Sequence, residues 1–82
     1  MEETHITPEQ CRAARALLAW SQDDLSAKAR VSKTTLALFE LGQRDPYERT
    51  LAALRKSFER AGVIFIEENG GGPGVRLRRR KR

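Results

Sequence analysis

The sequence has little of the chemistry on which secreted, metal-binding or membrane-spanning proteins depend. Its 82 residues include one cysteine, Cys11, and one histidine, His5, which excludes an internal disulfide and a Cys/His zinc cluster. No apolar run approaches the ~20 residues that span a bilayer, and the N-terminus lacks the pattern of a signal segment. We therefore expect a soluble, cytoplasmic protein that binds no metal and no cofactor and does not contact membranes.

Candidates for catalysis are equally few. Cys11 has no histidine partner and no second cysteine for redox chemistry, and Asp23 and Asp24 fit the first turn of a helix, where negative charge complements the dipole. Residues 69–74 are glycine-rich, but they lack the Lys-Ser/Thr ending of a phosphate-binding loop and fit a hairpin turn better. The sequence predicts a binding protein, not an enzyme.

Positive charge is distributed unevenly. The formal net charge is +5, and five of the 16 Lys and Arg residues form the C-terminal run RRRKR, which leaves 11 cations against 11 carboxylates in the rest of the chain. Such a run indicates a polyanionic partner, nucleic acid first, although a solvated, solubilising tail is the alternative. A chain of this length buries only ~60–65% of its unfolded surface, so a second subunit would stabilise its small core.

Helix-capping signals recur through the first half of the chain. Thr7, followed by proline and Gln10, predicts a helix over residues 8–19, and Ser21 with Asp24 repeats the signal. Ser32 opens a third short helix. Before the fourth helix, residues 45–48 either cap it through Asp45 or stay extended because of Pro46; an apolar stripe then runs to Gly62. Trp20, beside the first helix, is interpreted as a core residue.

The periodicity changes after Gly62. The β-branched and aromatic run 63–66, the glycine-rich segment and the alternating residues 75–78 predict a two-stranded hairpin. Two strands alone are marginal in water, so we expect one face to pack on the fourth helix and the other face, or an edge, on a second subunit. The expected fold class is mainly α: four helices, then a β-hairpin.

The stretch 21–43 suggests why two such short helices follow one another. Five side chains can share one small core if the second and third helices cross steeply: Leu25, Ala29, Val31, Leu36 and Phe39. Lys33, Thr34, Ala37 and Leu38 then stay outside. A short helix with a polar, exposed start, held across another helix, fits the major groove of B-DNA, which is about 12 Å wide.

At this point the chain resembles the Cro/Xre-type helix-turn-helix regulators of bacteria and phages. The resemblance covers residues 7–60 and is carried by Ser21-Gln22, Leu25, Ala27, Val31-Ser32, Leu36, Glu40 and Gly42. Two positions differ from the family pattern. Arg30 stands in the turn where glycine is usual, and Leu41 replaces a usual asparagine, which removes a phosphate contact.

The resemblance implies roles for particular residues. Gln22 would bind a DNA phosphate, and Lys33, Thr34 and Leu38 would face bases, with Ser32 and Thr35 beside them. Lysine can donate to guanine, threonine can bond to either base type, and leucine can only touch a thymine methyl. A solvated Lys33 and a Leu38 buried against a dimer partner or the hairpin are the alternatives. The expected phosphate contacts also include Arg44, unless it only pairs with Asp45 or Glu48, and the tail residues Arg78, Arg79, Arg80, Lys81 and Arg82.

The sequence thus predicts three parts: a helix-turn-helix domain over residues 7–61, a hairpin for dimerisation or packing over 62–78, and a basic tail over 79–82. The expected function is sequence-specific binding of double-stranded DNA by a homodimeric regulator, with recognition helix 33–40 in the major groove. Two alternatives remain open. The chain could be an antitoxin that uses the same motif and also covers a toxin partner, or an adaptor that binds protein or RNA.

Overall fold

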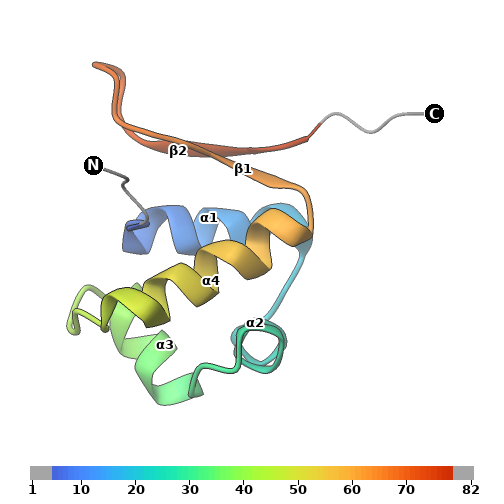
Figure 1. Ribbon diagram of the computed structural model, residues 1–82, viewed down its shortest axis with the longest axis vertical. Coiled ribbons are helices and arrows are strands. Elements are labelled where there is room, and N and C mark those ends of the chain that lie inside the picture. The colour runs from blue at the N-terminus through green and yellow to red at the C-terminus, as the bar shows by residue number, and fades with distance from the viewer. Residues whose placement is uncertain (1–4, 79–82) are drawn as a thin grey trace.

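The computed structural model describes residues 5–78 and shows four helices followed by a two-stranded hairpin (Figure 1). This confirms the expected fold class. The basic residues 79–82 lie outside the described residues. The elements are α1 (Pro8–Leu18), α2 (Gln22–Ala29), α3 (Lys33–Glu40), α4 (Glu48–Arg60), β1 (Val63–Ile66) and β2 (Gly74–Leu77).

Local cap chemistry sets where the first three helices begin. The Thr7 hydroxyl accepts a hydrogen bond from the backbone N–H of Gln10, and the Gln10 side-chain oxygen accepts one from the Thr7 N–H. Ser21 and Asp24 form the same reciprocal pair at α2, and the Ser32 hydroxyl caps α3. Each cap satisfies donors that have no partner within the helix and contributes about 1 kcal/mol. The three predicted helix starts are confirmed.

The first two helices each end at a left-handed residue that is not glycine. Ala19 has a φ of 57° and Arg30 has a φ of 59°. In this conformation the Cβ atom approaches the following carbonyl oxygen, which costs about 1–2 kcal/mol. With Ala19 as its C-cap, α1 ends at Leu18, one residue before the predicted end. Arg30 adopts the turn conformation that glycine adopts more easily.

The start of α4 resolves the alternative that the sequence left open. The helix begins at Glu48, and no side chain caps it at Tyr47. Residues 43–47 are not helical, in keeping with the restriction that Pro46 places on the residue before it. Asp45 therefore does not cap α4, and the extended alternative is the correct one.

The core lies between the helices and the hairpin. Four of the five side chains that the sequence placed there are buried, and the fifth, Ala29, is partly buried against them. Trp20 also packs on the core, where its ring stacks on Phe58 with 5.7 Å between ring centroids. Ile6, which precedes α1, was not predicted to be buried, but its side chain is only 4% exposed. The buried apolar side chains are Ile6, Cys11, Ala14, Leu25, Val31, Leu36, Phe39, Leu51, Leu54, Phe58, Val63 and Phe65.

The hairpin presents one face to this core. The strands are antiparallel, with Val63 opposite Leu77 and Phe65 opposite Val75. Because side chains alternate along a strand, the buried Val63 and Phe65 point to the helices, while Ile64 points outward and is half-buried. The hairpin is therefore a covering layer of the domain and not a separate arm.

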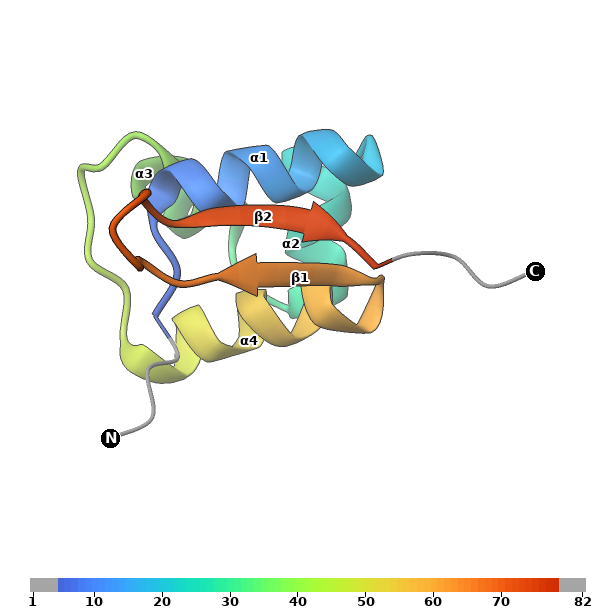
Figure 2. The same cartoon turned by 90° about the horizontal axis from the view of Figure 1, so that it is seen from above.

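The hairpin packs on two helices, whereas the sequence predicted packing on one. We expected packing on the fourth helix, and β1 does contact α4, but β2 contacts α1 as well (Figure 2). The side-chain amide of Gln10 in α1 donates to the carbonyls of Ile66 and Gly74, at 3.3 and 3.0 Å. These two bonds tie the end of the hairpin to the first helix.

The glycine-rich segment forms the hairpin turn, as predicted. The carboxylate of Glu68 accepts hydrogen bonds from the backbone N–H groups of Gly70 and Gly72, and both glycines have positive φ angles. This turn and the strands lie on one side of the helical layer, whereas α3 lies on the other (Figure 1). The side of the molecule that carries α3 is therefore left uncovered by the hairpin.

Candidate nucleic-acid interface

The segment α2, turn and α3 is held as one unit. Leu25, Val31 and Leu36 are buried in the common core and fix the two helices against each other. In the turn, the Ser26 hydroxyl donates to the Val31 carbonyl at 2.5 Å, and the Val31 N–H donates back to the Ser26 carbonyl at 3.2 Å. Two short helices with a rigid turn form a helix-turn-helix, whose second helix can enter a major groove.

The side chains expected to face bases lie on the outer surface of α3. Lys33 and Thr34 are exposed, and Leu38 is half-buried. Lys33 is not simply solvated, because its ammonium lies 3.1 Å from the carboxylate of Asp23 in α2. Both side chains of this pair are more than half exposed, so it contributes little stability and can be exchanged for a bond to DNA.

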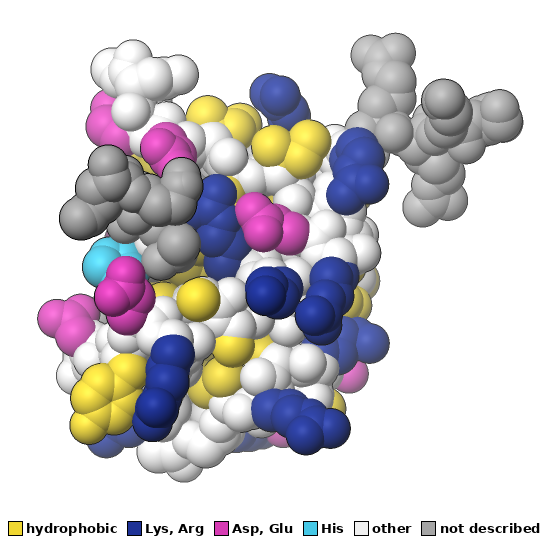
Figure 3. Space-filling view, in the orientation of Figure 1, with side chains coloured by type: hydrophobic (Ala, Val, Ile, Leu, Met, Phe, Trp, Pro, Cys, Tyr) yellow, Lys and Arg dark blue, Asp and Glu magenta, His cyan; other side chains and the backbone are white. Residues whose placement is uncertain are grey.

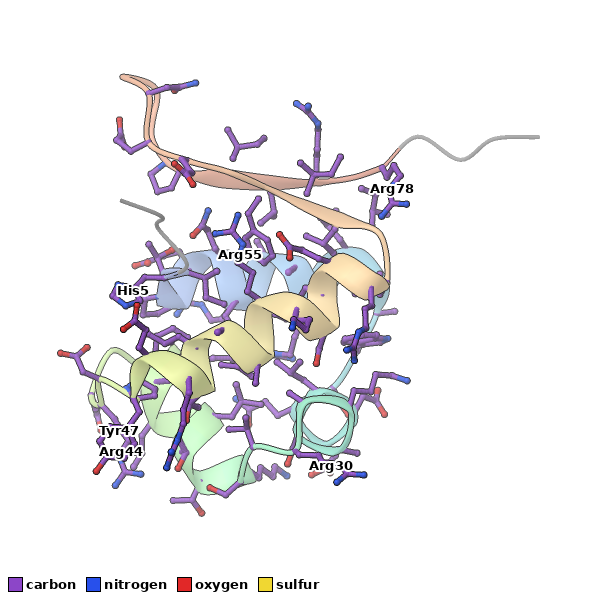
Figure 4. All side chains as sticks on the ribbon, viewed as in Figure 1. His5, Arg30, Arg44, Tyr47, Arg55 and Arg78 are labelled. Atoms are coloured by element: carbon purple, nitrogen blue, oxygen red, sulfur yellow. The ribbon has the colours of Figure 1, made fainter. Side chains whose placement is uncertain are left out.

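Thr35 and Arg44 belong to a small hydrogen-bonded chain beside α3. The Thr35 hydroxyl accepts hydrogen bonds from Ser32 at 2.9 Å and from the guanidinium of Arg44 at 3.0 Å. Arg44 therefore contacts α3 and not Asp45 or Glu48, its alternative partners. In Figure 4, Arg44 and Tyr47 lie together at the loop between α3 and α4, and Tyr47 is 77% exposed. The loop thus adds a cation and an aromatic ring to the same side of the molecule.

Gln22 lies at the start of α2, where the resemblance places a phosphate contact. Its side-chain amide donates a hydrogen bond to the Glu40 carboxylate at 2.9 Å, so one of the two N–H groups of this amide already has a partner within the protein. The other N–H and the free backbone N–H groups of the α2 start remain suited to a phosphate. The bond to Glu40 fixes the direction in which the amide points.

Glu40 is the centre of a buried polar network that the sequence analysis did not predict. Its carboxylate is 3% exposed and accepts two hydrogen bonds of 2.7 Å from Arg15 in α1. Cys11 donates its thiol to the same carboxylate at 3.1 Å, and Arg12 donates to the Glu40 backbone carbonyl. With Gln22, the network joins α1 and α2 to the end of α3. It therefore sets the position of α3 against the rest of the domain.

The network shifts the pKa values of its members. Burial raises the pKa of the Glu40 carboxyl, but the hydrogen bonds from Arg15, Gln22 and Cys11 lower it by more, so the pKa lies below its ordinary value. The hydrogen bond to Glu40 raises the pKa of Arg15 despite its partial burial. Burial, together with the bond to Glu40 and its charge, raises the pKa of Cys11. Cys11 is thus a buried neutral thiol, unsuited to nucleophilic chemistry.

The remaining candidates lie away from α3. Arg78 is on the hairpin side (Figure 4), where its guanidinium lies 3.4 Å from the backbone carbonyl of Glu59. His5 lies 3.9 Å from Glu48, near the start of α4. Among residues 5–78, no three His, Cys, Asp or Glu side chains are grouped so that they could hold a metal ion. None of the helices in this part is both long and apolar enough to cross a membrane.

Cations predominate on one side of the domain. Figure 3 shows Lys and Arg side chains over the lower and right-hand part of the view, whereas Asp and Glu gather toward the left. Exposed cations on α4 include Arg49, Lys56 and Arg60. Such a field raises the encounter rate with a polyanion at low salt, without selecting a sequence.

The functional residues that sequence reasoning missed are Arg15, Arg12 and the buried carboxylate of Glu40. Arg15 and Glu40 are 25 positions apart, so no helical spacing connects them. The signal that could have found them is a charged residue on the inward side of each of two helices, since buried charges are normally paired.

The comparison with curated proteins finds no match for this chain. The comparison with protein families does: the model of a helix-turn-helix family of the Cro/C1 type matches residues 12–60. The matched region extends from α1 to the last residue of α4 and makes up more than half of the sequence. It contains the turn, α3 and the Glu40 network except Cys11. The chain therefore belongs to the helix-turn-helix family of Cro/Xre-like, DNA-binding transcription regulators.

Proposed function

We propose that the protein binds double-stranded DNA sequence-specifically as a bacterial, cytoplasmic transcription regulator, with α3 in the major groove. The observation that carries this proposal is the exposed start of α3, where Lys33 and Thr34 project into solvent. Three buried side chains hold this helix against the core: Leu36, Phe39 and Glu40. Rigid placement matters because a base contact requires a hydrogen-bonding group to be held in position before binding. Gln22 and Arg44 border α3 and supply phosphate contacts.

Replacement of Lys33 by alanine tests base readout. We expect a loss of about 1–3 kcal/mol in binding free energy on the preferred site, together with relaxed preference at one base pair. The preferred site is first obtained by selection from a random duplex library, and affinities are then measured on it and on single-base variants. An equal loss on every sequence would show that Lys33 contacts phosphate and not a base.

The ion pair of Lys33 offers a matched control. Asp23→Asn removes the partner of Lys33 and one negative charge near the DNA, so it should leave the preferred sequence unchanged and not weaken binding. Weaker binding by this variant would mean that Asp23 positions Lys33 for readout. Lys56→Ala, an exposed cation of α4, controls for the general effect of losing one positive charge.

We propose further that two copies act together. Both recognition helices must face the same side of one duplex, so a two-fold axis has to run from the hairpin side to the α3 side. Leu17 of α1 and Leu77 of β2 are 41% and 44% exposed, and the elements that carry them pack together on one flank. Contact along this flank, which includes the β2 edge, would keep both α3 helices on one side. The half-sites would lie about 10 bp apart, or a multiple of this.

Leu17→Glu and Leu77→Glu test this contact. Each variant should sediment as a monomer at tens of micromolar, where the unchanged chain sediments as a dimer, because a carboxylate would be buried without a partner. Leu41→Glu alters a leucine that is 68% exposed on the α3 side and should leave the dimer intact. A monomeric unchanged chain under these conditions would rule out the proposed dimer.

A further inference from the structure

Arg30 has a conformation that its side chain does not favour. Among residues 5–78, Arg30 and Ala19 are the non-glycine residues with positive φ. Arg30 lies in the turn between α2 and α3, and its side chain is exposed. A strained backbone persists where its surroundings enforce it, and such residues occur often at functional sites.

Backbone bonds, and not the arginine side chain, enforce this turn. The N–H groups of Arg30 and Val31 both donate to the carbonyl of Ser26, and the Ser26 hydroxyl returns a bond to Val31. Within residues 5–78 the guanidinium of Arg30 makes no hydrogen bond or ion pair. The side chain therefore contributes nothing to the turn that glycine would not, and glycine would be less strained there.

The position of Arg30 suggests what the side chain does. Figure 4 shows Arg30 at the same lower side of the molecule as α3, and two residues separate it from Lys33. A guanidinium offers up to five N–H donors in a planar fork that suits phosphate. Arg30 differs in this from Lys33, the next cation along the chain, whose ammonium is paired with the carboxylate of Asp23.

We infer that Arg30 binds a phosphate of the DNA backbone beside the groove that α3 enters, and that its side chain occupies the strained turn for this contact. The inference rests on the proposed function and adds a residue to the interface. Because phosphates carry no sequence information, Arg30 contributes affinity and register, not discrimination.

Three replacements of Arg30 separate strain from charge. Arg30→Gly removes both, Arg30→Ala removes the charge and keeps a Cβ, and Arg30→Lys keeps both. We expect the glycine and alanine variants to bind about 5- to 10-fold more weakly near 0.1 M salt, and the slope of log affinity against log salt to flatten by ~0.9. The lysine variant should keep most of the affinity. Arg30→Gly should nevertheless raise the thermal midpoint by about 2–6 °C, because the strain that it relieves exceeds the extra entropy that glycine loses on folding.

Ala19→Gly is the matched control, because Ala19 has the same left-handed conformation at the end of α1. It should raise the thermal midpoint like Arg30→Gly and leave DNA affinity and its salt dependence unchanged. Lys56→Ala controls for the loss of one cation. An Arg30→Ala slope equal to that of Lys56→Ala would overturn the inference but leave the proposed function intact. No duplex binding by the unchanged chain would overturn both.

Discussion

Glu40→Ala should destabilise the domain by about 3–5 kcal/mol, because it leaves the half-buried guanidinium of Arg15 without its carboxylate. A chain of 82 residues has a total stability of about 4–12 kcal/mol, so the variant should lose a large part of its stability and unfold at a much lower urea concentration. The measurement is urea unfolding monitored by circular dichroism, with the midpoint lowered and the slope unchanged. Removing Glu40 also releases the amide of Gln22, so the folded fraction should bind DNA more weakly.

Two controls identify the buried pair as the cause. Glu59→Ala removes a carboxylate that is 47% exposed from its i,i+4 pair with Arg55 on α4 and should cost at most about 0.5 kcal/mol. The double variant Arg15→Ala with Glu40→Ala should be less destabilised than the sum of the two single variants, because no charge is then left unpaired. Strict additivity of the two changes would contradict the network.

The same carboxylate predicts a dependence of stability on pH. The pKa of Glu40 is lowered in the folded state, so its contribution is present above the pKa of the unfolded chain, ~4.3, and is lost as pH falls through the folded value. The free energy of unfolding should therefore decline below about pH 4 in the unchanged chain. Glu40→Gln should lack this part of the decline.

The parts of the fold that follow from neighbouring residues were predictable from the sequence. The caps at Thr7, Ser21 and Ser32 depend on hydrogen bonds over three residues, so the sequence contains both partners of each bond. The core of the helix-turn-helix follows from a helical period in the same way. Lys33 and Thr34 fall outside the buried positions of this period, so the sequence also predicted that they are exposed.

The parts that depend on distant residues were not predictable. Ile6 is buried in the common core, beside a hollow that Arg55 of α4 and Phe65 of β1 also line, and nothing near it in sequence indicates these neighbours. Gln10 shows the same limit: it was identified as a capping residue, yet its amide also binds the hairpin 56 and 64 residues later. Glu40 was noted as part of a family pattern, but its partner Arg15 could be found only when α1 and α3 were placed together.

Deletion of residues 78–82 should remove a sequence-independent part of the DNA affinity. Each neutralised phosphate contributes ~0.9 to the slope of log affinity against log salt, so the slope should flatten by about 2–4 units if half or more of the five charges engage. Filter binding or fluorescence anisotropy over a range of salt, with operator and random duplexes in parallel, measures this. Discrimination between the two duplexes should hardly change.

The place of Arg78 explains why affinity and discrimination should separate. Arg78 lies on the hairpin side, whereas α3 lies on the opposite side of a molecule whose longest extent is 36 Å. Because the base contacts are proposed for α3, cations at the hairpin end should meet phosphates, or a narrow A·T-rich minor groove, and add affinity without reading the operator. An unchanged salt slope would show that the tail only keeps the protein in solution, and lost discrimination would show that it reads sequence or groove shape.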